Sequence, residues 1–268
     1  MKVLIIGAGN MGKAFIESFL KDAFLNPNQV SVIEKNEKQQ NPLKELNITN
    51  IYPDFGDFVP KQDVIILATK PQDAHIVYSN LREYIQPNQI ILSIMAGITI
   101  ETISQQLGTT KIVRCMPNLP CQLGIGVTGF YADKSIDAEK AVEIKKLIEC
   151  TGLAIQLKEE SELHSITAIS GSGPAYVFYF MNAMIEQAKQ FGYSEDEACN
   201  MVAQTFEGAV ALYKANNLSC LEWINRVASK GGTTEAAISK FNQLKLDNTI
   251  QEGMQSALNR SVEMSKID

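Results

Sequence analysis

The chain has 268 residues, of which 45% are apolar and 20% charged, a balance typical of a globular protein with one large or two medium domains. A formal net charge of −6 argues against a nucleic-acid partner, and two histidines with five scattered cysteines argue against a metal site or a disulfide framework. No apolar run is long enough to span a bilayer, so we expect a cytoplasmic protein with no membrane partner.

The first 160 residues alternate short apolar runs with amphipathic stretches, which predicts an α/β fold. Alternating units of this kind form a parallel, doubly wound sheet with helices on both faces. The expected strands are Val3–Ile6, Gln29–Ile33, Val64–Leu67, Ile90–Ile94 and Lys111–Cys115, with Gly126–Tyr131 and Ala154–Leu157 as possible extensions of the same sheet. The expected helices are Met11–Lys21, Gln72–Tyr84, Ile100–Leu107 and one near Asp137–Glu149.

Beyond residue 160 the pattern becomes helical, with no convincing strand. We therefore predict a Rossmann-type dinucleotide-binding domain over residues 1–160 and an all-α domain over residues 161–268. A small helical domain so rich in apolar residues leaves apolar faces uncovered, so we expect a symmetric dimer at least. The expected helices are Pro174–Phe191, Ser194–Ala215, Cys220–Val227, Thr234–Gln243 and Thr249–Lys266.

A glycine-rich turn follows the first strand in the segment VLIIGAGNMG. Gly7 permits a tight turn, Gly9 lets the backbone approach a pyrophosphate, and Gly12 lets helix and strand pack closely. The pyrophosphate would bind the helix N-terminus through amides near Asn10 and Met11. A plain strand-to-helix turn is the alternative, but the strand, the helix and a later acidic residue favour a dinucleotide site.

That acidic residue, Glu34, ends the next strand, where a carboxylate hydrogen-bonds an adenosine ribose and repels a 2′-phosphate. This position favours NAD. Lys35 follows directly and could instead meet a 2′-phosphate. The choice between NAD and NADP therefore stays open.

Three further loops follow neighbouring strands and should meet at one edge of the sheet, where ligands bind in open α/β folds. Pro71 can begin a helix, and Lys70 could face the cofactor or solvent. The loops are Ala68, Thr69, Lys70 and Pro71; the segment SIMAG over Ser93–Gly97; and the segment RCMPNLP over Arg114–Pro120.

Two glycine-rich segments open helices in the second half of the chain. Gly171–Pro174 either packs against the nucleotide domain or shapes the floor of a site. The segment ASKGGTTEAAI over Ala228–Ile238 is either an ordinary helix cap, with a threonine and Glu235 at the positive end, or an anion cradle of free amides.

Taken together, these motifs resemble the pyrroline-5-carboxylate reductase family nearly end to end. GAGNMG, ATKPQ, SIMAGI, VRCMPNLP, ISGSGPAY and ASKGGTT stand in its order and spacing. The resemblance implies NAD(P)H-dependent reduction of 1-pyrroline-5-carboxylate to L-proline, the last step of proline biosynthesis. It also implies a helical dimerisation domain, an active site where two subunits meet, and a homodimer or a ring of dimers.

The resemblance also implies roles for individual residues. Thr234 would carry the hydroxyl nearest the ring nitrogen and act in catalysis. Lys230 departs from the family, in which proline is common at this position, and Glu34 departs from members with a polar or basic residue. The substrate carboxylate would bind Ser229, Gly231, Gly232, Thr233 and Thr234, and the cofactor would touch Gly7–Gly12, Ala68–Pro71 and Ala96.

Two rival functions fit the broad plan less well. A β-hydroxyacid dehydrogenase would need a lysine and an asparagine where this chain has Val177 and Met181. A non-catalytic dinucleotide-binding regulator would need no carboxylate cradle. Hydride transfer to an imine needs little acid–base machinery, which suits a chain in which we expect His164 to pack or cap and His75 to be exposed.

Overall fold

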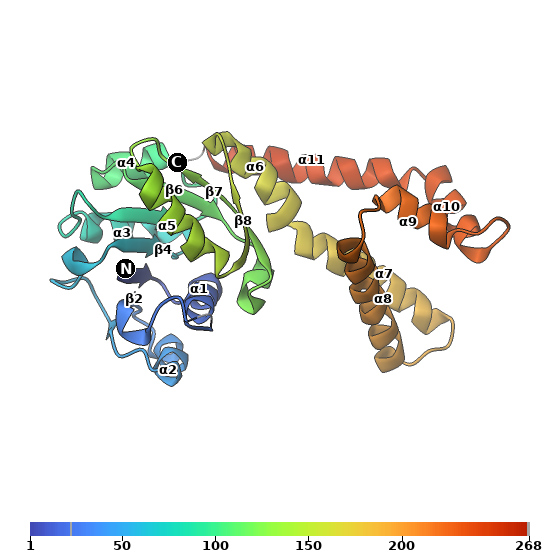
Figure 1. Cartoon of the computed structure of the whole chain (residues 1–268), viewed down its shortest axis with the longest axis horizontal. Coiled ribbons are helices and arrows are strands. Elements are labelled where there is room, and N and C mark those ends of the chain that lie inside the picture. The colour runs from blue at the N-terminus through green and yellow to red at the C-terminus, as the bar shows by residue number, and fades with distance from the viewer. Residues whose placement is uncertain (22, 267–268) are drawn as a thin grey trace. The chain divides into compact units, whose positions relative to one another are not determined.

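The structure, a computed structural model, describes residues 1–21 and 23–266, and the chain divides into two compact units (Figure 1). The first unit comprises Met1–Pro174 together with the C-terminal segment that begins at Ala257, and the second comprises Ala175–Ser256. The predicted boundary at residue 160 separates a cofactor-binding part from a helical part by their expected functions, whereas these units are defined by packing. The functional boundary therefore stays a prediction.

In the described part of the chain, the strands form one eight-stranded sheet of order β3-β2-β1-β4-β5-β6-β7-β8. The five strands expected of the parallel sheet, β1, β2, β4, β5 and β6, pair in parallel, as predicted, whereas β7 joins β6 antiparallel. The two possible extensions do join the sheet, as its last strands. The strands are β1 (Val3–Ile6), β2 (Val30–Ile33), β3 (Ile51–Tyr52), β4 (Val64–Leu67), β5 (Ile90–Ser93), β6 (Ile112–Met116), β7 (Gly126–Ala132) and β8 (Gly152–Gln156).

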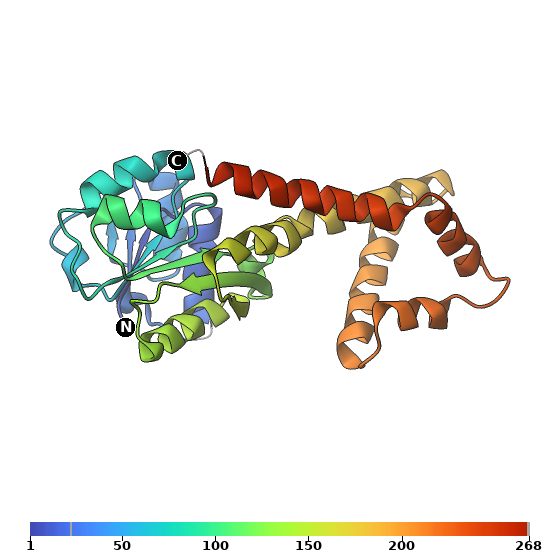
Figure 2. The same ribbon diagram turned by 90° about the horizontal axis from the view of Figure 1, so that it is seen from above.

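Helices cover both faces of the sheet, as Figure 2 shows for α3 and α4 on one side and α5 on the other. The central strands are buried on both faces and therefore read as continuous apolar runs such as VLII and VIIL. Residues of α1 (Asn10–Lys21), α2 (Glu37–Glu45) and α5 (Ala138–Glu149) belong to one buried cluster, and residues of α3 (Ala74–Leu81) and α4 (Ile100–Leu107) belong to the other.

The sequence did not reveal α2 and β3. The α2 segment EKQQNPLKE is polar, contains Pro42 and buries only Leu43, so it carries little apolar periodicity. β3 has two residues and lies at the edge of the sheet, so its pattern is too short to recognise. β3 matters for the candidate site, because Phe55, in the loop after it, lines the pocket described below.

The second unit holds helices and, within its described residues, no strand, as predicted. α8 and α9 each begin with a capping box, in which Ser194 pairs with Glu197 and Ser219 with Glu222. The helices after residue 160 are α6 (Leu163–Ile166), α7 (Gly173–Gln190), α8 (Glu195–Ala215), α9 (Cys220–Val227), α10 (Thr233–Gln243) and α11 (Leu246–Met264); the short 3-10 helices are Pro27–Gln29, Val59–Lys61, Pro71–Asp73, Leu119–Leu123 and Glu160–Glu162, and Thr167–Gly171 is a π-helix.

The helical unit has almost no apolar core of its own. Among its hydrophobic side chains only Ala198 and Val202 are buried, whereas Tyr179 is 77% and Phe191 is 73% exposed. α7 and α11 also border an apolar hollow of about 290 Å³. Exposed apolar helix faces of this kind are typical of a surface that another chain covers.

All five cysteines are free thiols. Cys115, Cys121 and Cys150 are buried, and burial raises the pKa of the Cys115 thiol. No group of three or more His, Cys, Asp or Glu side chains in the described residues could hold a metal ion. None of the described helices is both long and apolar enough to cross a membrane.

His164 anchors the end of α11 to the first unit. Its Nδ1 lies 2.9 Å from the Ser261 hydroxyl, and burial, aided by the positive charge of Arg114, lowers its pKa below the usual value. His164 therefore packs, as expected, and His75 is exposed.

This depressed pKa predicts a pH-dependent stability. Because the unfolded state has the higher histidine pKa, it binds more protons, and stability falls as the pH drops below about 6.5. Between pH 7.5 and 5.5 we expect the Tm of the wild type to fall more than that of His164→Asn. Parallel Tm profiles of the two proteins would contradict this role.

Candidate functional site

The glycine turn between β1 and α1 is built as the sequence predicts. Gly7 has a φ of +97°, and a β-carbon there would lie 3.0 Å from the Ala68 carbonyl oxygen. A β-carbon on Gly12 would overlap the Gly7 carbonyl, so its absence brings α1 against the strand. A β-carbon on Gly9 would meet nothing within 4 Å and would project into open space.

The first turn of α1 leaves its amides free. Lys13 donates its backbone N–H to the Gly9 carbonyl at 2.9 Å, which closes the helix. The N–H groups of Asn10, Met11 and Gly12 have no hydrogen-bond partner within the described residues. Together with the helix dipole, they form a site for an anion such as a diphosphate.

Glu34 is fixed beside this turn. One carboxylate oxygen accepts the Ala8 N–H at 2.9 Å, and the other accepts the Asn36 N–H at 2.8 Å. The side chain is half-buried, whereas Lys35 is exposed. A negative charge therefore stands where the sheet edge meets the predicted ribose site.

A pocket of about 300 Å³ opens at the carboxyl ends of β1, β2 and β4. Its residues Asp73, Ile76 and Asn80 lie at helical spacing, and sequence reasoning missed them although that spacing was a readable signal. Of the predicted cofactor residues, the pocket gathers Gly7, Glu34, Lys35 and Thr69; it adds Ile6, Ile33, Phe55, Asp73, Ile76, Val77 and Asn80.

The remaining predicted cofactor residues do not line this pocket. Ala68 donates its N–H to the Ile6 carbonyl at 2.9 Å and holds the loop against β1. Pro71 begins a 3-10 turn that leads into α3, as expected, and Lys70 is exposed. Ala96 lines a separate hollow of about 30 Å³, which Arg114 and Met116 also line.

The motifs RCMPNLP and ISGSGP meet within the first unit. Asn118, which is 7% exposed, donates its Nδ2–H to the Ser170 carbonyl at 3.0 Å, and its Oδ1 accepts the Val127 N–H at 2.8 Å. A β-carbon on Gly171 would lie 3.1 Å from the Met116 side chain. Gly171 therefore has a packing role, which was one of its two predicted interpretations.

Arg114, in the same motif, forms a largely buried ion pair. Its Nη1 lies 2.7 Å from the Glu160 carboxylate, and the same oxygen accepts the Ile100 N–H at 2.9 Å. The pair joins β6 to the first residue of α4. It is a structural contact that the sequence did not reveal.

The predicted substrate loop, Ser229–Gly232, is a type II turn in the second unit. Gly232 donates its N–H to the Ser229 carbonyl at 2.9 Å, and Gly231 at the third position has a φ of +74°. A β-carbon on Gly232 would lie 2.6 Å from the Ser229 hydroxyl oxygen, so a larger residue there would require the Ser229 side chain to move. The turn places Lys230 at its second position.

α10 starts without a side-chain cap. Its N-cap is Gly232, so the expectation that a threonine caps the helix is wrong: Thr233 is already the first helical residue. The N–H groups of Thr233, Thr234 and Glu235 have no partner within the described residues. The loop therefore offers the free amides of the anion cradle, with the half-buried Thr234 hydroxyl beside them.

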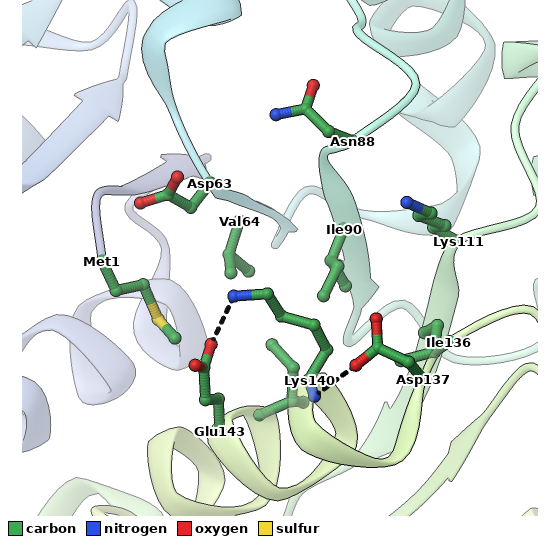
Figure 3. Close-up of a pocket in the computed structure, with 11 residues that line it drawn as sticks. Met1, Asp63, Val64, Asn88, Ile90, Lys111, Ile136, Asp137, Lys140 and Glu143 are labelled. Atoms are coloured by element: carbon green, nitrogen blue, oxygen red, sulfur yellow. Dashed lines mark hydrogen bonds and ion pairs between the residues drawn. The ribbon is translucent and has the colours of Figure 1, made fainter.

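A further hollow, of about 230 Å³, lies at the amino ends of the strands (Figure 3). Lys140 projects into it and pairs with Glu143 at 2.8 Å, and Val64 and Ile90 form part of its apolar wall. Ligands of doubly wound sheets bind at the opposite, carboxyl edge. This hollow is therefore separate from the candidate site.

A doubly wound sheet with a glycine turn, free helix amides and an acidic residue after the second strand defines a dinucleotide-binding oxidoreductase of the Rossmann class. The chain belongs to the pyrroline-5-carboxylate reductase family. It is 34% identical to the pyrroline-5-carboxylate reductase of Pasteurella multocida, and the match covers 99% of this chain and 98% of that protein.

Other comparisons agree. The enzyme of the same name from Pseudomonas aeruginosa is 31% identical over 99% of this chain and 97% of its own length. A family model described as pyrroline-5-carboxylate reductase dimerisation matches residues 160–264. A second, described as NADP oxidoreductase coenzyme F420-dependent, matches residues 2–97.

Solved structures share the fold over the whole chain. A pyrroline-5-carboxylate reductase from Coxiella burnetii superposes with a TM-score of 0.91 at 29% identity, covering 98% of each chain. The Plasmodium falciparum pyrroline carboxylate reductase with NADP bound has a TM-score of 0.88 at 24% identity, covering 99% of this chain and 98% of the other. The predicted two-part fold is confirmed.

The geometry of the glycine turn predicts different effects on thermal stability for two substitutions. Gly12→Ala forces a methyl group into the Gly7 carbonyl, and we expect it to destabilise the fold by about 1–3 kcal/mol and lower Tm by several degrees. Gly9→Ala has room in the fold, so Tm should stay near the wild-type value.

The same Gly9→Ala methyl group would, however, lie between the amides and a bound pyrophosphate. We expect the Kd for a reduced nicotinamide cofactor, measured by fluorescence titration, to rise about tenfold. An unchanged Kd in a folded Gly9→Ala protein would show that the cofactor does not use this turn.

Proposed function

We propose that the protein reduces 1-pyrroline-5-carboxylate to L-proline with NAD(P)H, the last step of proline biosynthesis. The observation that carries the proposal is the turn before α10, which leaves the Thr233 and Thr234 amides free beside a hydroxyl. The named activity of full-length relatives at about 30% identity supports it. The rival dehydrogenase and regulator functions lack such support.

The cofactor would bind along the carboxyl edge of the sheet. Its diphosphate fits the free amides of Asn10, Met11 and Gly12, because Gly9 leaves open space there. Its adenosine end fits the pocket beside Glu34 and Lys35, and the remaining predicted contacts are Ala68, Thr69, Lys70, Pro71 and Ala96. A reduced nicotinamide supplies the hydride when bound.

The substrate carboxylate would bind the α10 amides, with the Ser229 hydroxyl and the backbone of Gly231 and Gly232 shaping the cradle. A helix N-terminus favours a negative charge and needs no arginine. Fixing the carboxylate in this way holds the C=N bond in one orientation, which is the main requirement for hydride transfer between two rings.

Thr234 would act on the ring nitrogen. In the overall reaction the imine carbon gains a hydride, the nitrogen gains a proton, and the cofactor is oxidised. Among the hydroxyls of the cradle, we assign Thr234 to hold or relay this proton, because the family resemblance places its hydroxyl nearest the ring nitrogen, and solvent is the final source of the proton.

A second copy of the chain would complete the enzyme. The helical unit leaves Tyr179, Phe191 and other apolar side chains exposed, and the family model that matches this region is described as a dimerisation domain. We propose a homodimer, with a ring of dimers as a further step of assembly. In this scheme residues 1–160 bind the cofactor, and residues 161–268 dimerise and bind the substrate.

We also propose a cytoplasmic location. The five free thiols suit a reducing compartment, in which reduced nicotinamide cofactors are also available.

Activity on the imine tests the function directly. The wild type should consume NAD(P)H, followed by absorbance, when 1-pyrroline-5-carboxylate is added at neutral pH. Thr234→Ala should lower kcat about tenfold or more, whereas Thr234→Ser keeps the hydroxyl and should stay near the wild type. A wild type without imine-dependent oxidation refutes the function; normal kinetics of Thr234→Ala refutes only the role of Thr234.

Cofactor choice tests the position of Glu34. Its carboxylate and the neighbouring Asp73 bring two negative groups to the pocket, so we expect a higher kcat/KM with NADH than with NADPH. Glu34→Gln removes one charge and should raise the ratio of kcat/KM for NADPH to that for NADH about tenfold. Lys35→Gln is the matched control and should move the ratio in the opposite direction.

A further inference from the structure

We propose that Glu235 is a positioning residue that locks the substrate turn while leaving the helix amides free for substrate. This inference rests on the proposed function. A carboxylate oxygen of Glu235 accepts the N–H of Gly231 at 2.6 Å.

This contact differs from the corresponding contacts at the start of α8 and α9. In α8 and α9 the third helical residue is also a glutamate, Glu197 or Glu222, and it accepts the N–H of the N-cap serine. In return, the serine hydroxyl accepts the amide of that glutamate. Each of these helices thereby uses one of its free amides to cap itself.

α10 lacks the second half of this exchange. Its N-cap, Gly232, has no side chain, so the first-turn amides stay free. Glu235 reaches past the N-cap to Gly231, the residue before it. The carboxylate therefore secures the turn without occupying the amides that the substrate would use.

The turn needs such a lock because its sequence is permissive. Gly231 has a φ of +74° and no neighbour within 4 Å of a β-carbon, so packing does not hold it. Lys230 occupies the second position of the type II turn, where proline would restrict the backbone. The Lys230 N–H has no hydrogen-bond partner within the described residues, so a proline there would cost no bond.

The consequence is a specific kinetic signature. Without Glu235 the turn is ordered in a smaller fraction of molecules, so the apparent affinity for substrate falls by that fraction while the ordered molecules react normally. We expect Glu235→Ala to raise KM for 1-pyrroline-5-carboxylate about three- to tenfold and to change kcat by less than about twofold. Glu235→Gln keeps an acceptor oxygen and should stay closer to the wild type.

Two further variants separate positioning from general helix stability. Lys230→Pro added to Glu235→Ala should restore most of the KM, because proline supplies the missing restraint by a different route. Glu197→Ala is the matched control: it removes a glutamate from the same position of α8 and should leave KM unchanged.

Hydrogen exchange gives a readout that does not depend on activity. We expect a peptide covering residues 229–235 to exchange faster in Glu235→Ala than in the wild type, and Lys230→Pro to restore its protection. If the wild type does not reduce the imine, the proposed function fails, and this exchange pattern still decides the role of Glu235. Unchanged exchange, a KM that stays the same or falls in Glu235→Ala, or no rescue by Lys230→Pro would overturn the inference.

Discussion

The candidate chemistry depends on two helices, α1 and α10, whose first residue directly follows a glycine. Five other helices, α2, α4, α5, α8 and α9, have a side-chain oxygen from Asn36, Thr99, Asp137, Ser194 or Ser219 that accepts a first-turn amide. α1 follows Gly9, and α10 follows Gly232. α1 and α10 have no such side-chain cap, so their first-turn amides stay available at the two proposed anion sites.

The sequence predicts much of this plan because glycines mark both loops. A β-carbon on Gly12 or Gly232 would collide with the backbone or a side chain of its own loop. Such positions can be read from the sequence when strand and helix patterns surround them. The strands were also readable, since burial on both faces makes them continuous apolar runs.

Other parts of the site could not be predicted, for different physical reasons. The polar face of α2 and the two residues of β3 carry too little pattern, so Phe55 after β3 was missed as a pocket residue. The contact from Glu235 to Gly231 depends on the type II geometry of the turn, which the composition of the segment does not specify. Apolar periodicity did identify the helices of the second unit. It does not, however, distinguish a buried helix face from an exposed one, such as the face that carries Tyr179, which is 77% exposed.

The two cradles also share a second feature, which concerns charge. Glu34 accepts the N–H of Ala8, the residue before Gly9, and Glu235 accepts the N–H of Gly231, the residue before Gly232. In each loop a carboxylate from outside the turn fixes the amide just ahead of the helix and leaves the helix amides free.

This arrangement has a consequence for selectivity. A helix N-terminus by itself attracts any anion, since its field is equivalent to only about half a positive charge and has no directional partner for a particular ligand. A fixed carboxylate at the border of each cradle opposes any additional negative charge on the ligand, such as a 2′-phosphate near Glu34 or a second carboxylate near Glu235. In the proposed site, the same residue would therefore order the loop and oppose a ligand that carries additional negative charge.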